Sequence, residues 1–220
     1  MSVTVDLSSL AHTGMVVMRP HAGEERALLL LNVAETQARI RHLDGFVSAS
    51  FLSDRDGQVL VEFLQWRSAR HVDAAFAEPA FREHLPVVTK MAPHPTIAFG
   101  AAAAVLTGEG QTHFALDHRR YAATVLRVEG ADFDGGLRKV VDWAQLLVGK
   151  IVDGAVVFAD RGSSQIGVLM AGGFIELPVA DLQEQGVAVV EHLGALALYA
   201  SIGAASSAEQ PLEYVMAVDE

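Results

Sequence analysis

The sequence predicts an α+β fold made of two similar units, each with the element order β-α-β-β-α-β. The first observation is a pair of β-hairpins whose turns, residues 54–57 and 160–163, carry Asp and Gly between apolar runs. The second is a stretch with helical spacing before each hairpin. The third is that the whole series returns after about 110 residues, as expected of an internal repeat. This element order is that of the ferredoxin-like unit.

The first unit is predicted to contain six elements. They are, in chain order, strand 13–19, helix 24–43, strands 46–53 and 58–67, helix 68–90 and strand 96–106. Pro20 ends the first strand, and Gly45 marks the end of the first helix. Pro79 and Pro86 are expected to interrupt the second helix, because proline lacks the N–H that a helix needs for its hydrogen bonds.

The second unit is predicted to repeat these six elements. They are strand 121–128, helix 133–148, strands 154–159 and 165–171, helix 178–202 and strand 212–218. A polar stretch around Gly108 and Gly110 joins the units. The predicted division is therefore a first repeat over residues 1–107, a linker over 108–118 and a second, degenerate repeat over 119–220.

Each unit taken alone would leave one face of its sheet uncovered. The helices protect one side, while Val59, Val61 and Phe63 point to the other. Such an apolar face needs a partner. The second unit can supply that partner within the same chain, so we expect the two units to pack as a fused pseudo-dimer.

The composition narrows the classes of function. The formal net charge is −11, whereas nucleic-acid binding needs clustered Lys and Arg, so no nucleic acid is expected as a partner. The chain has no Cys, which excludes disulfides and thiolate metal sites. No apolar run approaches the roughly 18 residues of a membrane span, and no signal peptide is evident. We expect a cytoplasmic protein that binds no membrane.

One strand face carries the residues best suited to chemistry. Because strand side chains alternate, Glu62 and Trp66 share a face of strand 58–67 with Leu60 and Leu64. A carboxyl group among aliphatic side chains has a raised pKa, which suits a general base near neutral pH. An indole can stack on an aromatic ligand and donate its N–H. The alternatives are an ion pair between Glu62 and Arg19 or another cation, and a core Trp66 bonded to a backbone carbonyl.

The stretch from Gly45 to Leu85 also resembles a known family. It has a Gly45-Phe46 turn, an Asp-Gly hairpin, a strand ending in Gln65-Trp66, and the motif Glu-Pro-Ala-Phe-Arg at 78–82. In these features, over residues 12 to 103, the chain resembles the antibiotic biosynthesis monooxygenase domain. The resemblance implies ferredoxin-like units paired as a dimeric α+β barrel. That family includes cofactor-independent oxygenases of aromatic polyketides and haem-degrading enzymes.

The resemblance also suggests a site. In the family an Asn that helps to bind substrate stands four residues before the Trp, where this chain has Glu62. We predict Glu62 and Trp66 as catalytic residues. The predicted substrate-binding residues are Arg19, Leu64, His71, Phe81 and His84. No position matches convincingly the helix His that binds iron in the haem-degrading relatives.

The second unit is predicted to lack an equivalent site. Aligning the two hairpins places Gly172 and Gly173 where the first unit has Gln65 and Trp66. We therefore expect one ligand site per chain, in the first unit, lined by Glu62, Trp66 and residues of helix 68–90. Metal sites look poor, since His113 and His118 are the nearest to a ligand pair and nothing completes a geometry.

The predicted function is that of a cofactor-independent monooxygenase, with a small aromatic, polyketide-type substrate and dioxygen as its partners. A substrate that ionises to an electron-rich anion can reduce dioxygen without flavin or metal, so no cofactor is expected. Two alternatives remain open: a non-catalytic small-molecule binding protein of the same fold, and a haem-binding or haem-degrading protein. The chain is expected to act as a monomeric pseudo-dimer or as a homo-oligomer.

Overall fold

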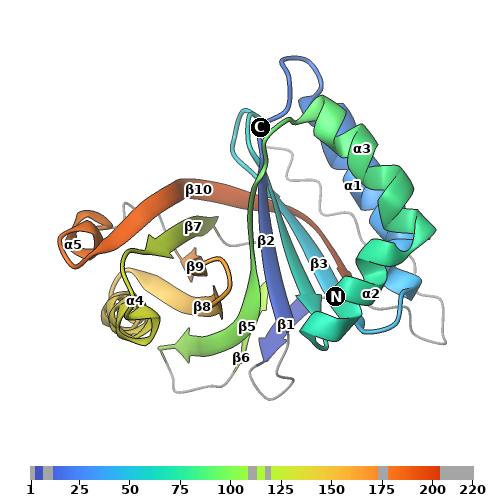
Figure 1. The fold of residues 1–220 in the computed structure, drawn as a ribbon. Helices are drawn as coiled ribbons and strands as arrows, with labels where there is room; N and C mark the ends of the chain where they lie inside the picture. The colour runs from blue at the N-terminus through green and yellow to red at the C-terminus, as the bar shows by residue number, and fades with distance from the viewer. Residues whose placement is uncertain (1–2, 7–11, 109–112, 117–119, 173–177, 204–220) are drawn as a thin grey trace.

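The computed structural model describes residues 3–6, 12–108, 113–116, 120–172 and 178–203. Within these ranges, eight antiparallel strands close into one barrel, in the order β10-β3-β4-β2-β5-β8-β9-β7. Helices lie on the outside of the barrel, in two groups on different sides (Figure 1). The predicted α+β barrel of two β-α-β-β-α-β units is confirmed.

The first unit follows its predicted order. Its elements are β2 (His12–Met18), α1 (Glu25–Ala38), the 3-10 turn η2 (Ile40–His42), β3 (Phe46–Ser53), β4 (Leu60–Trp66), α2 (Ala69–Ala77), α3 (Pro79–Met91) and β5 (Thr96–Thr107). The predicted helix 68–90 is two helices, because Glu78, which precedes Pro79, is extended with φ −70° and ψ 144°. Pro86 lies inside α3 and does not end it.

The second unit departs from its prediction after the hairpin. Its elements are β7 (Arg120–Val128), α4 (Phe133–Leu147), β8 (Val152–Asp160), β9 (Gln165–Gly172), α5 (Ala180–Gln183) and β10 (Val187–Gly203). The predicted helix 178–202 is therefore wrong: only four residues are helical, and a 17-residue strand follows. The predicted strand 212–218 lies outside the described residues.

Strand β10 forms because two sheet edges need a partner. It pairs with β7 along its first part and with β3 along its second, so it joins the two units and closes the barrel. Strand β5 makes the other junction, by pairing with β2 and β8. Outside the barrel, β1 (Val3–Asp6) pairs with β6 (His113–Leu116), which falls within the predicted linker.

The pairing register shows that the two units are related by a pseudo-twofold axis. Trp66 lies between His12 and Phe46, and Gly172 lies between Arg120 and Val152 in the same pattern. A register shift follows at the same place in both junctions, between Ala102 and Ala104 and between Leu198 and Ala200. These ladders match when Gly172, and not Gly173 as predicted, is placed opposite Trp66. The pairing of β10 with β7 differs, since it has two register shifts that the equivalent pairing of β5 with β2 lacks.

The same register gives the counterpart of Glu62. Glu62 pairs with Val16 and Phe51, and Val168 pairs with Thr124 and Val157 in the equivalent places. Val168 therefore occupies in the second unit the position that Glu62 occupies in the first.

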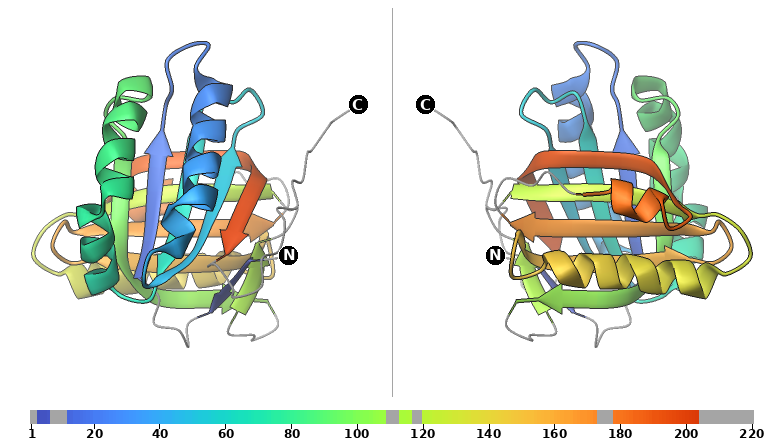
Figure 2. Two further views of the ribbon diagram at one scale, coloured as in Figure 1. Left: turned by 90° about the vertical axis from the view of Figure 1, so that its right-hand side faces the viewer. Right: turned by 90° about the vertical axis from the view of Figure 1, so that its left-hand side faces the viewer.

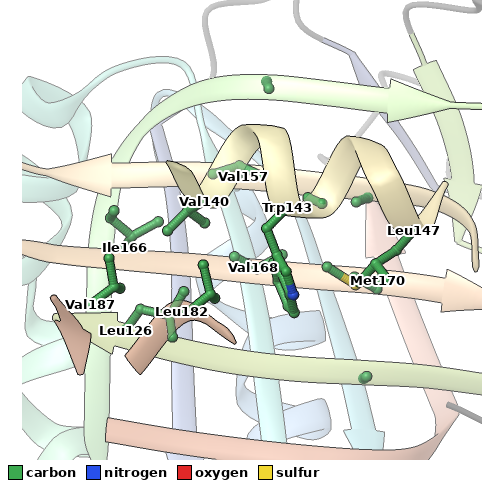
Figure 3. Close-up of a cluster of buried hydrophobic side chains, with 14 of the residues drawn as sticks. Leu126, Val140, Trp143, Leu147, Val157, Ile166, Val168, Met170, Leu182 and Val187 are labelled. Carbon is green, nitrogen blue, oxygen red and sulfur yellow. The ribbon is translucent and has the colours of Figure 1, made fainter. Parts of the chain in front are cut away.

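Three buried clusters hold the molecule together. One fills the barrel interior with side chains from both units, including Val61 and Phe63, so the face predicted to need a partner is covered from within the chain. The second lies between the first unit's sheet and helices α1 to α3. Figure 2 shows these helices over one group of strands and α4 over the other. The third lies beneath α4, around Trp143 (Figure 3).

Candidate functional site

Glu62 lies in the middle of β4, on the face that helices α1 to α3 cover. Its cross-strand neighbours are Val16 and Phe51, and its neighbours along the same face are Leu60 and Leu64. Among the described residues, none forms a hydrogen bond or an ion pair with its carboxylate. Burial raises the pKa of Glu62 to about 7, because poor solvation disfavours the charged form.

Glu62 is not sealed into this core. The flanking Leu60 and Leu64 are almost fully buried, whereas Glu62 and its neighbour Val16 both keep part of their surface accessible. The next residue along this row is Ile97 of β5, which pairs with Val16 and is 46% exposed. Glu62 and Val16 are thus partly accessible and Ile97 is exposed, so the row of side chains that contains the carboxylate reaches the surface at β5.

Trp66 closes one end of this face. Its side chain is 1% exposed and packs edge-on against Phe46, with ring centroids 5.3 Å apart. Phe81 of α3 lies at 6.2 Å on a tilted plane. Within the described chain, nothing accepts a hydrogen bond from the indole N–H, so the predicted alternative of a backbone carbonyl partner finds no support.

Sequence reasoning missed a histidine beside Trp66. His12 begins β2, pairs with Trp66, and stacks on Phe99 with centroids 6.3 Å apart. Burial lowers its pKa, while the charges of Asp160 and Asp73 act in the opposite direction. The alternation of β2 would have placed His12 on the Trp66 face, but the strand was predicted to begin one residue later.

Arg19 does not reach Glu62. Its guanidinium donates to both carboxylate oxygens of Glu191 on β10, at 2.9 and 2.7 Å. This bidentate pair joins the first unit to the second, and about half of the Arg19 side chain remains exposed. The proposed alternative of a Glu62–Arg19 ion pair is therefore wrong, and the predicted role of Arg19 in substrate binding is unsupported.

His71 also lies away from Glu62. Its ring packs over Gly45, where a Cβ atom would collide with it. Its Nδ1 is 2.8 Å from the Ser68 hydroxyl, and its Nε2 is 3.5 Å from a carboxylate oxygen of Asp44. These contacts fix the start of α2 to the turn before β3, and the predicted substrate-binding role of His71 stays a prediction.

His84, by contrast, faces inward from α3. It is buried together with Phe81 and Val88, at helical spacing. Burial lowers the pKa of His84, the carboxylate of Glu35 on α1 raises it, and Arg39 lowers it further. Leu64, Phe81 and His84 thus belong to the covered face of the first unit, and their role in substrate binding stays a prediction.

A groove of about 700 Å³ lies on the outer side of α3. It is lined by Phe76, Arg82, Leu85, Pro86, Thr89 and Lys90. All of these residues belong to the predicted helix 68–90, but Glu62 and Trp66 do not line the groove. The pocket that was predicted around Glu62 and Trp66 therefore remains a prediction. Phe76 links the groove to the interior, since its ring packs on Phe81 and Phe99 at 5.2 and 6.0 Å.

Two further features of the described ranges bear on function. No three His, Asp or Glu side chains gather there in a way that would hold a metal ion. None of the helices in those ranges combines the length and the apolar character needed to span a bilayer.

Comparison with known proteins gives one sequence relative. No protein-family model matches the chain. Tetracenomycin-F1 monooxygenase from Streptomyces glaucescens is 44% identical over 52 residues. That match covers 24% of this chain and 46% of the relative, so the chain spans about half the length of that protein.

Solved structures match much more of the fold. An anthrone oxidase-like protein superposes with a TM-score of 0.74 at 14% identity, over 95% of this chain and 100% of the other. A protein from Lactobacillus acidophilus, provisionally named a monooxygenase, matches with a TM-score of 0.55 at 11% identity, over 88% and 96% of the two chains. Over 52 residues the chain is thus similar in sequence to a monooxygenase, and its fold of two ferredoxin-like units in tandem is similar to that of an anthrone oxidase-like protein.

Proposed function

We propose that the protein is a cofactor-independent monooxygenase that oxidises a small aromatic, polyketide-type molecule with dioxygen. The observation that carries this proposal is the unpartnered carboxylate of Glu62, whose pKa is raised to about 7 by burial and which lies on one strand face with Trp66. A base with this pKa is about half ionised at neutral pH, where it can both take up and return a proton.

The site would work by moving one proton while the substrate supplies the electrons. The Glu62 carboxylate removes an acidic C–H or phenolic proton, leaving an electron-rich anion. The anion passes one electron to dioxygen, and the resulting radical and superoxide join to form a C–O bond. The peroxide takes the proton back from Glu62, and the hydroperoxide then loses water. The sum is R₂CH₂ + O₂ → R₂C=O + H₂O, which needs no further reductant.

The surrounding residues suit this chemistry. Leu60, Leu64 and Phe51 keep the carboxylate poorly solvated, which strengthens it as a base. Trp66, Phe46 and Phe81 supply aromatic surface at one end of the face. The names of the relatives, a tetracenomycin-F1 monooxygenase and an anthrone oxidase-like protein, favour a fused aromatic substrate with an acidic ring position.

The test is oxygen uptake by the purified protein in the presence of anthrone-type compounds, followed with an oxygen electrode in buffer treated with a chelator. We expect uptake of one dioxygen per molecule of quinone formed, with one oxygen atom of ¹⁸O₂ in the product. Binding of the compounds without oxygen uptake would instead identify a non-catalytic binding protein. A Soret band on addition of haemin, with no oxidation of anthrones, would favour the haem-binding alternative.

A further inference from the structure

The helix-covered face of the first unit contains polar atoms that no protein group satisfies. Asn32 and Thr36 lie on the buried side of α1, and each is 1% exposed. The Asn32 amide donates to the Met18 sulfur at 3.7 Å. The Asn32 amide oxygen and the Thr36 hydroxyl have no hydrogen-bond partner within the described chain. Buried polar groups are normally paired, so these two call for an explanation.

The course of α1 gives the level of these atoms along β4. The helix begins at the β3–β4 turn, where a Cβ on Gly57 would lie 3.5 Å from Glu25. It leads through η2 to the start of β3, where Phe46 donates its backbone N–H to Leu43 at 3.2 Å. Phe46 pairs with Trp66, so α1 runs along β4 from its Leu60 end toward its Trp66 end.

The spacing along the two elements then matches. Met18, which the Asn32 amide contacts, pairs with Leu60. Thr36 is one turn further along α1, an advance of about 6 Å. The two strand residues from Leu60 to Glu62 advance by about 7 Å. Thr36 therefore lies at the level of Glu62, with Asn32 one step toward the hairpin end.

The buried face of α4 in the second unit has no such atoms. Its buried residues are Gly136, Val140, Trp143, Ala144 and Leu147. Thr124, the buried polar side chain of β7, is paired with His192 at 2.9 Å. Of the buried side chains named here on α1, α4 and β7, only those on α1, in the unit that carries Glu62, have unpaired polar atoms.

We propose that Asn32 and Thr36 are substrate-binding residues that select a polyhydroxylated aromatic ring system; this inference rests on the function proposed above. The amide oxygen of Asn32 can only accept, so it requires a hydroxyl on the substrate. The Thr36 hydroxyl can donate or accept, so it pairs with a carbonyl or with a second hydroxyl. The substrate thus directs its acidic position to Glu62 and two oxygen substituents, about 6 Å apart, to α1.

A binding role and a structural role predict opposite results for substitution. An atom without a protein partner adds nothing to the stability of the ligand-free protein. Replacing Thr36 with Val should therefore leave unfolding unchanged or shift it toward greater stability, while Asn32→Leu also loses the weak amide bond to the Met18 sulfur. Either replacement should weaken only those ligands that carry the matching hydroxyl.

The experiment compares 1,8-dihydroxyanthraquinone with unsubstituted anthraquinone, neither of which can be turned over. Dissociation constants come from quenching of tryptophan fluorescence. The variants are Asn32→Leu and Thr36→Val, with Thr124→Val as the matched control in the second unit. Thr36→Ser, which keeps the hydroxyl, serves as the rescue variant.

We expect the native protein to prefer the dihydroxy compound by about 100-fold, because each of its two hydroxyls adds one hydrogen bond worth about tenfold. Asn32→Leu and Thr36→Val should each lower this ratio by about tenfold, while Thr124→Val and Thr36→Ser keep it. An unchanged ratio in both Asn32→Leu and Thr36→Val, or no preference in the native protein, overturns the inference. A preserved preference without any oxygen uptake would refute the monooxygenase function and leave the recognition of hydroxyl groups intact.

Discussion

The two helix-covered faces of the barrel have equivalent strand pairing around β4 and β9, but the first buries polar side chains and the second buries an apolar cluster. Beneath α1 and α3, the first unit holds an unpartnered carboxylate, two unpaired polar side chains and a buried His84. Beneath α4, the second unit holds an apolar cluster in which Trp143 is the largest side chain (Figure 3). Its indole donates to the Pro178 carbonyl at 3.3 Å. The comparison teaches that the same backbone arrangement can enclose an apolar core in one unit and poorly solvated polar groups in the other.

The largest effect is expected from placing a carboxylate in the second unit. Val168→Glu puts at the equivalent position the side chain that the first unit carries as Glu62, but the cluster around Val168 leaves it fully buried. We expect a loss of about 4 kcal/mol in the free energy of unfolding, because a buried unpaired charge is strongly destabilising. Urea unfolding at pH 8 measures this, with Val168→Ala as the control for lost volume. Equal stability of the two variants would show that the helix-covered face of the second unit tolerates a carboxylate as well as that of the first unit does.

The next effect concerns turnover. Glu62→Gln keeps the shape of the side chain but cannot accept a proton, so we expect oxygen uptake to fall by about 100-fold or more. In the native protein the rate should rise with pH through about 7, as the Glu62 carboxyl group ionises, and then level off. In the variant this step should be absent. If Glu62→Gln retains native oxygen uptake with an accepted substrate, Glu62 is not the base.

The same variant should be more stable than the native protein. The pKa of Glu62 is about 7 in the fold, against an ordinary value of 4.5, so the folded state holds the proton more tightly than the unfolded state. Ionisation therefore reduces stability as pH rises from 4.5 to 7, and the loss is complete above 7. At pH 8 we expect Glu62→Gln to gain about 2 kcal/mol, the partial exposure of Glu62 keeping this below the full effect of the shift. The gain should vanish at pH 4; a gain that is independent of pH would assign it to packing instead.

The smallest effects come from the two tryptophans. Trp66→Phe keeps an aromatic ring beside Phe46 and Phe81, so we expect at most about a tenfold loss in kcat/KM. Trp143→Phe removes volume from the second core and the bond to Pro178, which should lower stability by about 1 to 2 kcal/mol and leave kcat/KM within about twofold. Reversed results, with turnover depending on Trp143, would place a site in the second unit.

The sequence predicted those parts of the molecule that depend on short-range pattern. Alternation along β4 was enough to place Glu62, Leu64 and Trp66 on one face. Phe81 and His84, predicted as substrate-binding residues of helix 68–90, are buried on the inner side of α3. The repeat predicted the barrel, because it supplied a partner for Val61 and Phe63.

The parts that failed depend on contacts between distant residues. Arg19 is paired with Glu191, which lies 172 positions away, and no short-range sequence pattern predicts that ion pair. Strand β10 was taken for a helix, because its Leu and Ala residues suit a helix and only the open edges of β7 and β3 make it a strand. Asn32 was passed over as one polar residue in a helix, since its burial depends on how α1 packs on the sheet.

The two junctions of the barrel, β5 with β8 and β10 with β3, are made by strands of one continuous chain. In a dimer of identical subunits, each substitution appears on both sides of the twofold axis. A substitution that improves one site must then be tolerated at the equivalent position of the other subunit. Each unpaired buried polar group also lowers the stability of the dimer twice, once in each subunit. Covalent linkage removes this constraint, so Glu62 and Val168 can differ although they hold the same place in the two units. The fused chain therefore carries one poorly solvated carboxylate per barrel, where a dimer of identical subunits would carry two.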